Sequence, residues 1–123
     1  MSIVALVSGG LDSTLMAKLT DEEGIRQIPL FIDYGQIARD RELGACNKAM
    51  EVLKLPSPKI ANLAGYGVII QSGLTNEILH IVEDAFTPGR NMLFLLTASA
   101  LAQQSNADAI SIGLLHELSL IHI

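Results

Sequence analysis

A short apolar run, residues 3–7, leads directly into the hexapeptide Ser-Gly-Gly-Leu-Asp-Ser at residues 8–13, after which leucines recur at helical spacing. The layout is therefore a strand, a glycine turn and a helix. Such a turn directs backbone N–H groups and the positive end of a helix dipole at one point, where an anion binds well. Gly9 and Gly10 allow a close approach of the backbone to a phosphate, and the hydroxyls of Ser8 and Ser13 add hydrogen-bond donors.

This loop differs from the two common nucleotide-binding loops. It has no lysine and is not a P-loop, and it lacks the Gly-x-Gly-x-x-Gly spacing of dinucleotide-binding folds. Ser-Gly-Gly-x-Asp-Ser after a strand instead resembles the PP-loop of the ATP pyrophosphatases, which cleave ATP between the α and β phosphates. The alternative is a strand-to-helix turn that is capped by serine and binds no ligand.

The bulk properties describe one small domain or part of a larger one. Half of the 123 residues are apolar, which strands buried on both faces explain in part and a truncated domain explains further. Apolar runs are too short to span a bilayer, the N-terminus does not resemble a signal peptide, and Cys46 is the only cysteine. We therefore expect a cytoplasmic protein with no membrane partner. The net charge of −5 argues against a nucleic-acid partner.

Strand-like and helix-like segments alternate along the chain. Strands are predicted at residues 3–7, 28–32, 59–63 and 109–112, and helices at 11–23, 38–53 and 92–104, with weaker helical character at 75–82. Gly24 is placed to end the first helix. This alternation predicts an α/β fold, a Rossmann-like open parallel sheet with flanking helices. Ligands bind such sheets beyond the carboxyl ends of the strands. The loops at residues 8–13, at 33–36 and from Gly113 should therefore share one rim, and residues 87–91 could lie over it.

Two carboxylates near this rim have two interpretations each. Asp12 would repel phosphates unless a Mg²⁺ ion bridges them, and it could instead be a helix-start charge that the dipole favours. Asp33 ends a strand where dinucleotide folds place a ribose-binding carboxylate, and it could instead initiate a turn with Gly35. Tyr34 and Gln36 bring an aromatic face and an amide to the same rim.

Arg90 and Asn91 follow a Pro-Gly turn. A guanidinium binds a carboxylate or phosphate in a bidentate manner, so we expect Arg90 to contact a ligand. The alternative is a helix start with a solvated Arg90 and with Asn91 as the N-cap. Glu42, in the charged start of the second helix, is retained as a candidate rim residue.

The remaining reactive residue types indicate no second site. His80, His116 and His122 lack metal-ligand spacing and are taken as non-catalytic. Cys46 falls on an apolar helix face and is predicted to belong to the core.

Four motifs in order, at residues 8–13, 31–36, 86–94 and 112–113, resemble the 7-cyano-7-deazaguanine synthase family of queuosine biosynthesis, over residues 3–117. The resemblance implies an adenine nucleotide alpha hydrolase-like fold and an ATP-dependent carbon–nitrogen ligase. That enzyme activates the carboxylate of 7-carboxy-7-deazaguanine, forms the amide with ammonia, and dehydrates the amide to the nitrile with a second ATP. The implied ligands are ATP, Mg²⁺, ammonia and the deazaguanine acid, and a homodimer is an option for a full-length protein.

The resemblance also implies roles for residues of this chain. Arg90 and Asp12 would be catalytic, and Asp12 would hold the metal. The residues implied in binding ATP or substrate are Ser8, Gly9, Gly10, Leu11, Asp12, Ser13, Asp33, Tyr34, Gln36, Arg90, Asn91 and Gly113.

The chain departs from the family in two respects. Ile37 and Ala38 stand where family members often carry Arg-His. Family members also continue into a further substrate-binding segment and a four-cysteine zinc site, whose cysteines this sequence lacks. We therefore expect residues 1–118 to be a truncated, inactive ATP-binding PP-loop domain, and residues 119–123 to be an unrelated tail. The alternatives are another PP-loop enzyme, such as an amidotransferase-type synthetase or a tRNA-modifying enzyme, and a non-enzymatic nucleotide-binding module.

Overall fold

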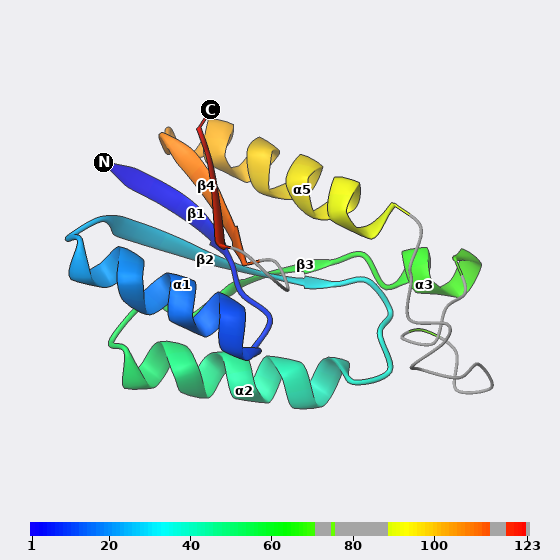
Figure 1. Cartoon of the computed structure of the whole chain (residues 1–123). Helices are drawn as coiled ribbons and strands as arrows, with labels where there is room; N and C mark the ends of the chain where they lie inside the picture. The colour runs from blue at the N-terminus through cyan, green and yellow to red at the C-terminus, as the bar shows by residue number, and fades with distance from the viewer. Residues whose placement is uncertain (71–74, 76–88, 114–117, 123) are drawn as a thin grey trace.

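The strands form one five-stranded sheet in the order β3-β2-β1-β4-β5 (Figure 1). This computed structural model describes residues 1–70, 75, 89–113 and 118–122. The strands are β1 (Ser2–Leu6), β2 (Arg26–Asp33), β3 (Lys59–Asn62), β4 (Ala109–Gly113) and β5 (Leu118–His122). The helices are α1 (Leu11–Glu22), α2 (Arg39–Val52), α3 (Gly65–Ile69) and α5 (Arg90–Gln104).

Strands β3, β2, β1 and β4 run parallel to one another, and β5 pairs with β4 in the antiparallel direction. Strand β1 is central, with Val4 opposite Ile28 of β2 on one side and Ile110 of β4 on the other. A parallel strand in the middle of such a sheet is covered on both faces and is therefore apolar throughout. The unbroken apolar run that opens the sequence has this physical cause.

Helices cover both faces of the sheet, α1 and α2 on one and α5 on the other (Figure 1). Alternate residues of each strand point to opposite faces. Val4 and Leu6 pack with Ala98 and Ala102 of α5, among the buried residues of that layer. The other layer contains Ala5, Val7, Ala17, Phe31, Cys46 and Met50. Small alanines on the buried faces of α1 and α5 allow both helices to pack closely on the sheet.

The α/β class and the parallel sheet predicted from the sequence are confirmed, and each predicted strand and helix within the described residues is present within two residues of its expected bounds. Gly24 follows α1 with a φ of +74°, as expected of a residue that ends a helix. Cys46 is fully buried in the core, also as predicted. The weak helical prediction at residues 75–82 lies outside the described residues, Thr75 excepted.

Two elements were not predicted, the short helix α3 and the strand β5. Helix α3 is five residues long and contains two glycines, so it has no amphipathic period to recognise. Strand β5 occupies residues that we expected to form an unrelated tail, and it continues the sheet beside β4. Within the described residues, no helix combines the length and the apolar character that a membrane span requires.

Candidate functional site

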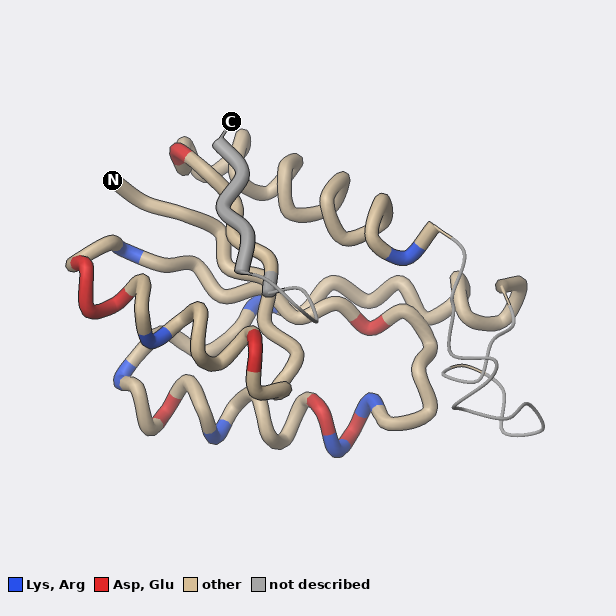
Figure 2. The backbone as a smooth tube through the Cα atoms, viewed as in Figure 1, with Lys and Arg blue, Asp and Glu red and all other residues tan. Residues whose placement is uncertain are grey.

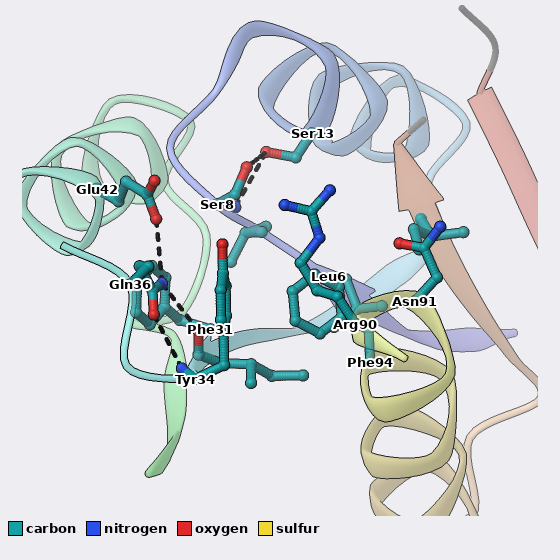
Figure 3. A pocket seen from close by; sticks show the side chains of 13 residues that line it. Leu6, Ser8, Ser13, Phe31, Tyr34, Gln36, Glu42, Arg90, Asn91 and Phe94 are labelled. Carbon is teal, nitrogen blue, oxygen red and sulfur yellow. Dashed lines mark hydrogen bonds between the residues drawn. The ribbon is translucent and has the colours of Figure 1, made fainter. Parts of the chain in front are cut away.

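A cavity of about 410 Å³ opens at the carboxyl ends of β1, β2 and β4 (Figure 3). Its volume is within the range of small-molecule sites. The chain leaves β1 toward β2 on one side, while β4 lies on the other side of β1, which makes this position the topological switch point of the sheet. The lining residues are Leu6, Val7, Ser8, Ser13, Phe31, Ile32, Tyr34, Gln36, Glu42, Arg90, Asn91, Phe94 and Ile112.

The glycine loop forms one wall of the cavity. Ser13 Oγ accepts a hydrogen bond from the backbone N–H of Ser8 at 3.1 Å and lies 3.2 Å from Ser8 Oγ, so the two hydroxyls that face the cavity are tied together. Gly9 has a φ of +79°, a conformation that side chains disfavour. Ser8, Gly9 and Ser13 therefore belong to one rigid turn.

Helix α1 begins immediately after this turn. Its N-cap is Gly10, which has no side chain that could cap the helix. The backbone N–H groups of Leu11, Asp12 and Ser13 belong to the first turn, for which the helix itself supplies no acceptor. Together with the helix dipole, these groups favour an anion beside the loop.

Six expected ligand-binding residues do not line the cavity: Gly9, Gly10, Leu11, Asp12, Asp33 and Gly113. Leu11 is 83% exposed on the outside of the loop, Asp12 is half-buried in the first turn of α1, and Gly113 ends β4. Asp12 lies in the first turn of α1, where the helix dipole favours a negative charge. A ligand that contacts Asp12 would have to reach outside the cavity. The described part of the chain contains no cluster of three or more His, Cys, Asp or Glu residues that could hold a metal.

The exit of β2 forms the second wall and is held by Gln36. Its Oε1 accepts the backbone N–H of Tyr34 at 2.9 Å, and its Nε2 donates to the carbonyl of Ile32 at 3.2 Å. The same Nε2 donates to Oε1 of Glu42, on α2, at 3.1 Å (Figure 3). The Gln36 amide thus holds both the loop after β2 and the carboxylate of Glu42 in place.

Asp33 organises the turn that follows β2. Its Oδ1 accepts the backbone N–H of Gly35 at 3.0 Å, and its Oδ2 pairs with Nε of Arg39 at 2.8 Å. The carboxylate is buried and is not among the lining residues. Of the two interpretations of Asp33, this geometry agrees with the one in which Asp33 initiates a turn. The ion pair with Arg39 was not predicted from the sequence.

Helix α5 supplies the third wall. Arg90 is its first residue and the only charged residue in its sequence (Figure 2). A cation at the amino end of a helix is opposed by the helix dipole, so helix stability does not account for its presence. Its side chain instead lines the cavity beside Tyr34 (Figure 3). The alternative interpretation of Asn91 as the N-cap is wrong, because the N-cap is Gly89 and Asn91 is the second residue of the helix.

Tyr34 lies between the charged groups of the cavity. Burial raises the pKa of its hydroxyl above the usual 10.0, and the negative charge of Glu42 raises it further. Hydrogen bonding and positive charge from Arg90 lower this pKa and offset only part of the effect. The Tyr34 ring contacts that of Phe94, with centroids 5.6 Å apart. The phenol is therefore a neutral hydrogen-bonding group at physiological pH, set between an anion and a cation.

The floor of the cavity is apolar and was not identified as part of the site from the sequence. It is formed by Leu6, Phe31, Ile32, Phe94 and Ile112. These residues are the ends of buried strands and one turn of α5, so the hydrophobic pattern that predicted the core contained no separate signal for a ligand. Phe94 is the exception, since it lies one helical turn after Arg90 and therefore on the same face.

An open parallel α/β sheet with a glycine turn and a cavity at its switch point is the architecture of Rossmann-like nucleotide-binding proteins. Comparison with known families identifies the particular family. Residues 2–119 match the family described as queuosine biosynthesis protein QueC. The chain belongs to this family.

Curated relatives carry the name 7-cyano-7-deazaguanine synthase. Those of Nautilia profundicola and a Sulfurovum species are each 34% identical over 122 residues, which is 93% of this chain and 55% of the relative. The protein of Sulfurimonas denitrificans is 32% identical over 93% of this chain and 54% of its own length. The chain therefore spans about half the length of the curated relatives it matches.

Proposed function

We propose that this chain is the ATP-binding portion of a 7-cyano-7-deazaguanine synthase. The observation that carries the proposal is a cavity with a serine–glycine loop at one wall and Arg90 at another, in a chain of the QueC family. The loop is suited to phosphates and the guanidinium to a carboxylate or phosphate. The names of the relatives supply the product, a deazaguanine that bears a nitrile.

The proposed reaction uses two ATP molecules. A carboxylate oxygen of 7-carboxy-7-deazaguanine attacks the α-phosphorus of ATP, which releases pyrophosphate and forms an acyl adenylate. Ammonia displaces AMP and leaves an amide. The amide oxygen attacks a second ATP in the same way, and loss of AMP and of both protons on nitrogen gives the nitrile. Both original carboxylate oxygens leave on AMP, so the atoms balance without water.

The protein's part in such a sequence is to position the reactants and to neutralise charge. The loop from Ser8 to Ser13 would hold the pyrophosphate that leaves, where N–H groups and hydroxyls converge. Arg90 would hold a carboxylate or the α-phosphate from the opposite wall. The apolar floor would exclude water from the adenylate, and its half-buried Phe94 would provide a face for a planar ring.

The family resemblance implies two metals, Mg²⁺ and zinc, and the residues of this chain suit only the first. Mg²⁺ is commonly held by one or two carboxylates together with phosphate oxygens, and Asp12 at the loop could provide one such ligand. Zinc sites need a closed set of cysteine and histidine ligands. This sequence has a single cysteine, which is buried in the core, so the chain itself does not fit a zinc site.

Calorimetric titration of the chain with Mg·ATP tests the proposal. Gly10 has an extended backbone, φ −80° and ψ 169°, which valine can adopt. A Cβ there would have only Ser8 Oγ nearby, at 3.3 Å. Gly10→Val should therefore fold and should abolish ATP binding, because a side chain occupies the place where a phosphate must approach.

Gly44→Ala is the matched control. Gly44 lies in α2 with no atom within 4 Å of an added Cβ, so this variant should bind ATP like the unmodified chain. Unchanged ATP affinity in folded Gly10→Val would contradict the assignment of the loop to phosphate. An unmodified chain that is folded and binds no ATP would overturn the proposed function.

A further inference from the structure

Among the described lining residues, two carry a formal charge, Glu42 from α2 and Arg90 from α5. The proposed function uses Arg90 and leaves Glu42 without a role. Both charges influence Tyr34 from different elements, one raising and one lowering the pKa of its hydroxyl. The cavity therefore has an anionic side and a cationic side around one aromatic residue (Figure 3).

The Glu42 carboxylate is held in place by Gln36. Nε2 of Gln36 divides its two hydrogens between the Ile32 carbonyl and Glu42 Oε1, and its Oε1 accepts from the Tyr34 backbone. Both amide hydrogens are committed, so Gln36 cannot donate to a ligand without breaking these bonds. Gln36 thus positions Glu42 and leaves ligand contact to it.

Most of the accepting capacity of Glu42 remains available. An ionised carboxylate has about four lone-pair positions, and the described residues use one, on Oε1. No Lys, Arg or His among the described residues forms an ion pair with Glu42. A half-buried, acceptor-only group beside an apolar floor is stabilised by a ligand that presents N–H donors.

We infer that Glu42 is a specificity-determining residue that accepts the ring N–H and the exocyclic amino group of a guanine-type ring. This inference rests on the proposed function and names the part of the substrate that the anionic side recognises. A guanine-type edge presents two adjacent donors, which suit the two oxygens of a carboxylate. An adenine edge presents one donor and one acceptor, and the acceptor would face a negative charge.

The arrangement of the charges agrees with the same ligand. The guanine-type edge is on the six-membered ring of a 7-deazaguanine, and the 7-substituent is on the five-membered ring at the other side. A ligand with donors at one end and a carboxylate at the other is complementary to a cavity with Glu42 on one side and Arg90 on the other. Phe94, a half-buried residue of the apolar floor, provides a surface for a planar ring.

The test compares three probes on the chain and on Glu42→Gln: ATP, 7-carboxy-7-deazaguanine, and the analogue of that acid lacking the 2-amino group. The unmodified chain should prefer the amino-bearing acid at least about tenfold, because loss of the 2-amino group leaves the half-buried Glu42 carboxylate without one of its donors. Glu42→Gln should reduce this preference to less than about threefold, since a neutral amide replaces the carboxylate and introduces its own donor. ATP affinity should be unchanged.

Glu51→Gln is the matched control, an exposed change on the same helix, and should keep the full preference. If Glu42 merely braced Gln36, the variant would weaken both acids equally and keep their ratio, which would overturn the inference. Selective loss of ATP affinity in Glu42→Gln would overturn it as well. If the unmodified chain binds ATP but neither acid, only the inferred role of Glu42 is refuted. If the folded chain does not bind ATP, the proposed function is refuted.

Discussion

A Cβ atom on Gly9 would lie 2.6 Å from the carbonyl oxygen of Glu42, in the first turn of α2. The glycine loop therefore rests directly on the helix that supplies the anionic side of the cavity. Atoms of Ala45 and Cys46 would also be within 3.0 Å of that Cβ. The absence of a side chain at Gly9 therefore allows the loop to pack this closely on α2.

We predict that Gly9→Ala destabilises the chain by about 2–4 kcal/mol, from a positive φ and from the contact with backbone atoms of α2. Gly24→Ala separates the two causes, because Gly24 has a φ of +74° but open space around its Cβ position. That variant should cost about 1–2 kcal/mol. Urea unfolding of both variants provides the comparison, and equal losses would show that close packing at Gly9 contributes nothing.

Replacing Arg90 by lysine keeps the charge but removes the planar fork that binds a carboxylate or phosphate through two parallel bonds. We predict that Arg90→Lys weakens binding of 7-carboxy-7-deazaguanine about tenfold or more. Arg26→Lys is the control, an exposed change at the opposite end of the sheet. Equal affinity in Arg90→Lys and Arg26→Lys would reduce Arg90 to a surface charge.

The buried thiol predicts a pH dependence of stability. Burial raises the pKa of Cys46 from 9.0 to about 11. The unfolded chain therefore loses its thiol proton first as pH rises, and the free energy of unfolding should fall between pH 9 and about 11. In Cys46→Ala this component should be absent, so the difference in stability between the two proteins should narrow on going from pH 8 to pH 10.5. Urea unfolding at both pH values measures the change, and a constant difference would show that the thiol titrates normally.

We predict that this 123-residue chain does not make 7-cyano-7-deazaguanine, because it spans about half the length of the relatives that carry the synthase name. We also expect no stoichiometric zinc in the purified chain, since structural zinc requires ligands that its residues do not provide. Incubation with ATP, Mg²⁺, ammonia and the carboxylic acid, followed by mass spectrometry, is the measurement. Sustained formation of the nitrile would show that the chain contains a complete active site.

The fold could be predicted from the sequence because its signals are local. An apolar run followed by a glycine turn and a leucine period identifies β1 and α1, and the same alternation identifies most of the sheet. The rim could be anticipated because the carboxyl ends of parallel strands meet at one edge, and Ser8, Tyr34 and Arg90 are indeed found around one cavity.

The remaining features depend on tertiary contacts. The sequence places Asp33 and Gln36 in one motif, yet their side chains point to different partners, one to Arg39 and the other to Glu42. That difference follows from where α2 begins, which residue patterns locate only to within a few residues. The role of Gly9 likewise depends on its approach to α2, since two adjacent glycines look equivalent in the sequence.

The most direct test of phosphate binding at the glycine loop is a titration of the ¹⁵N-labelled chain with pyrophosphate, followed through its backbone amide resonances. Phosphate binding at this loop predicts saturable shifts that are largest at Gly9, Gly10, Leu11 and Ser13, where N–H groups converge at the start of α1. These shifts should be absent in folded Gly10→Val. Saturable binding that leaves these four amides unmoved, or no binding by a folded chain, would contradict the central claim.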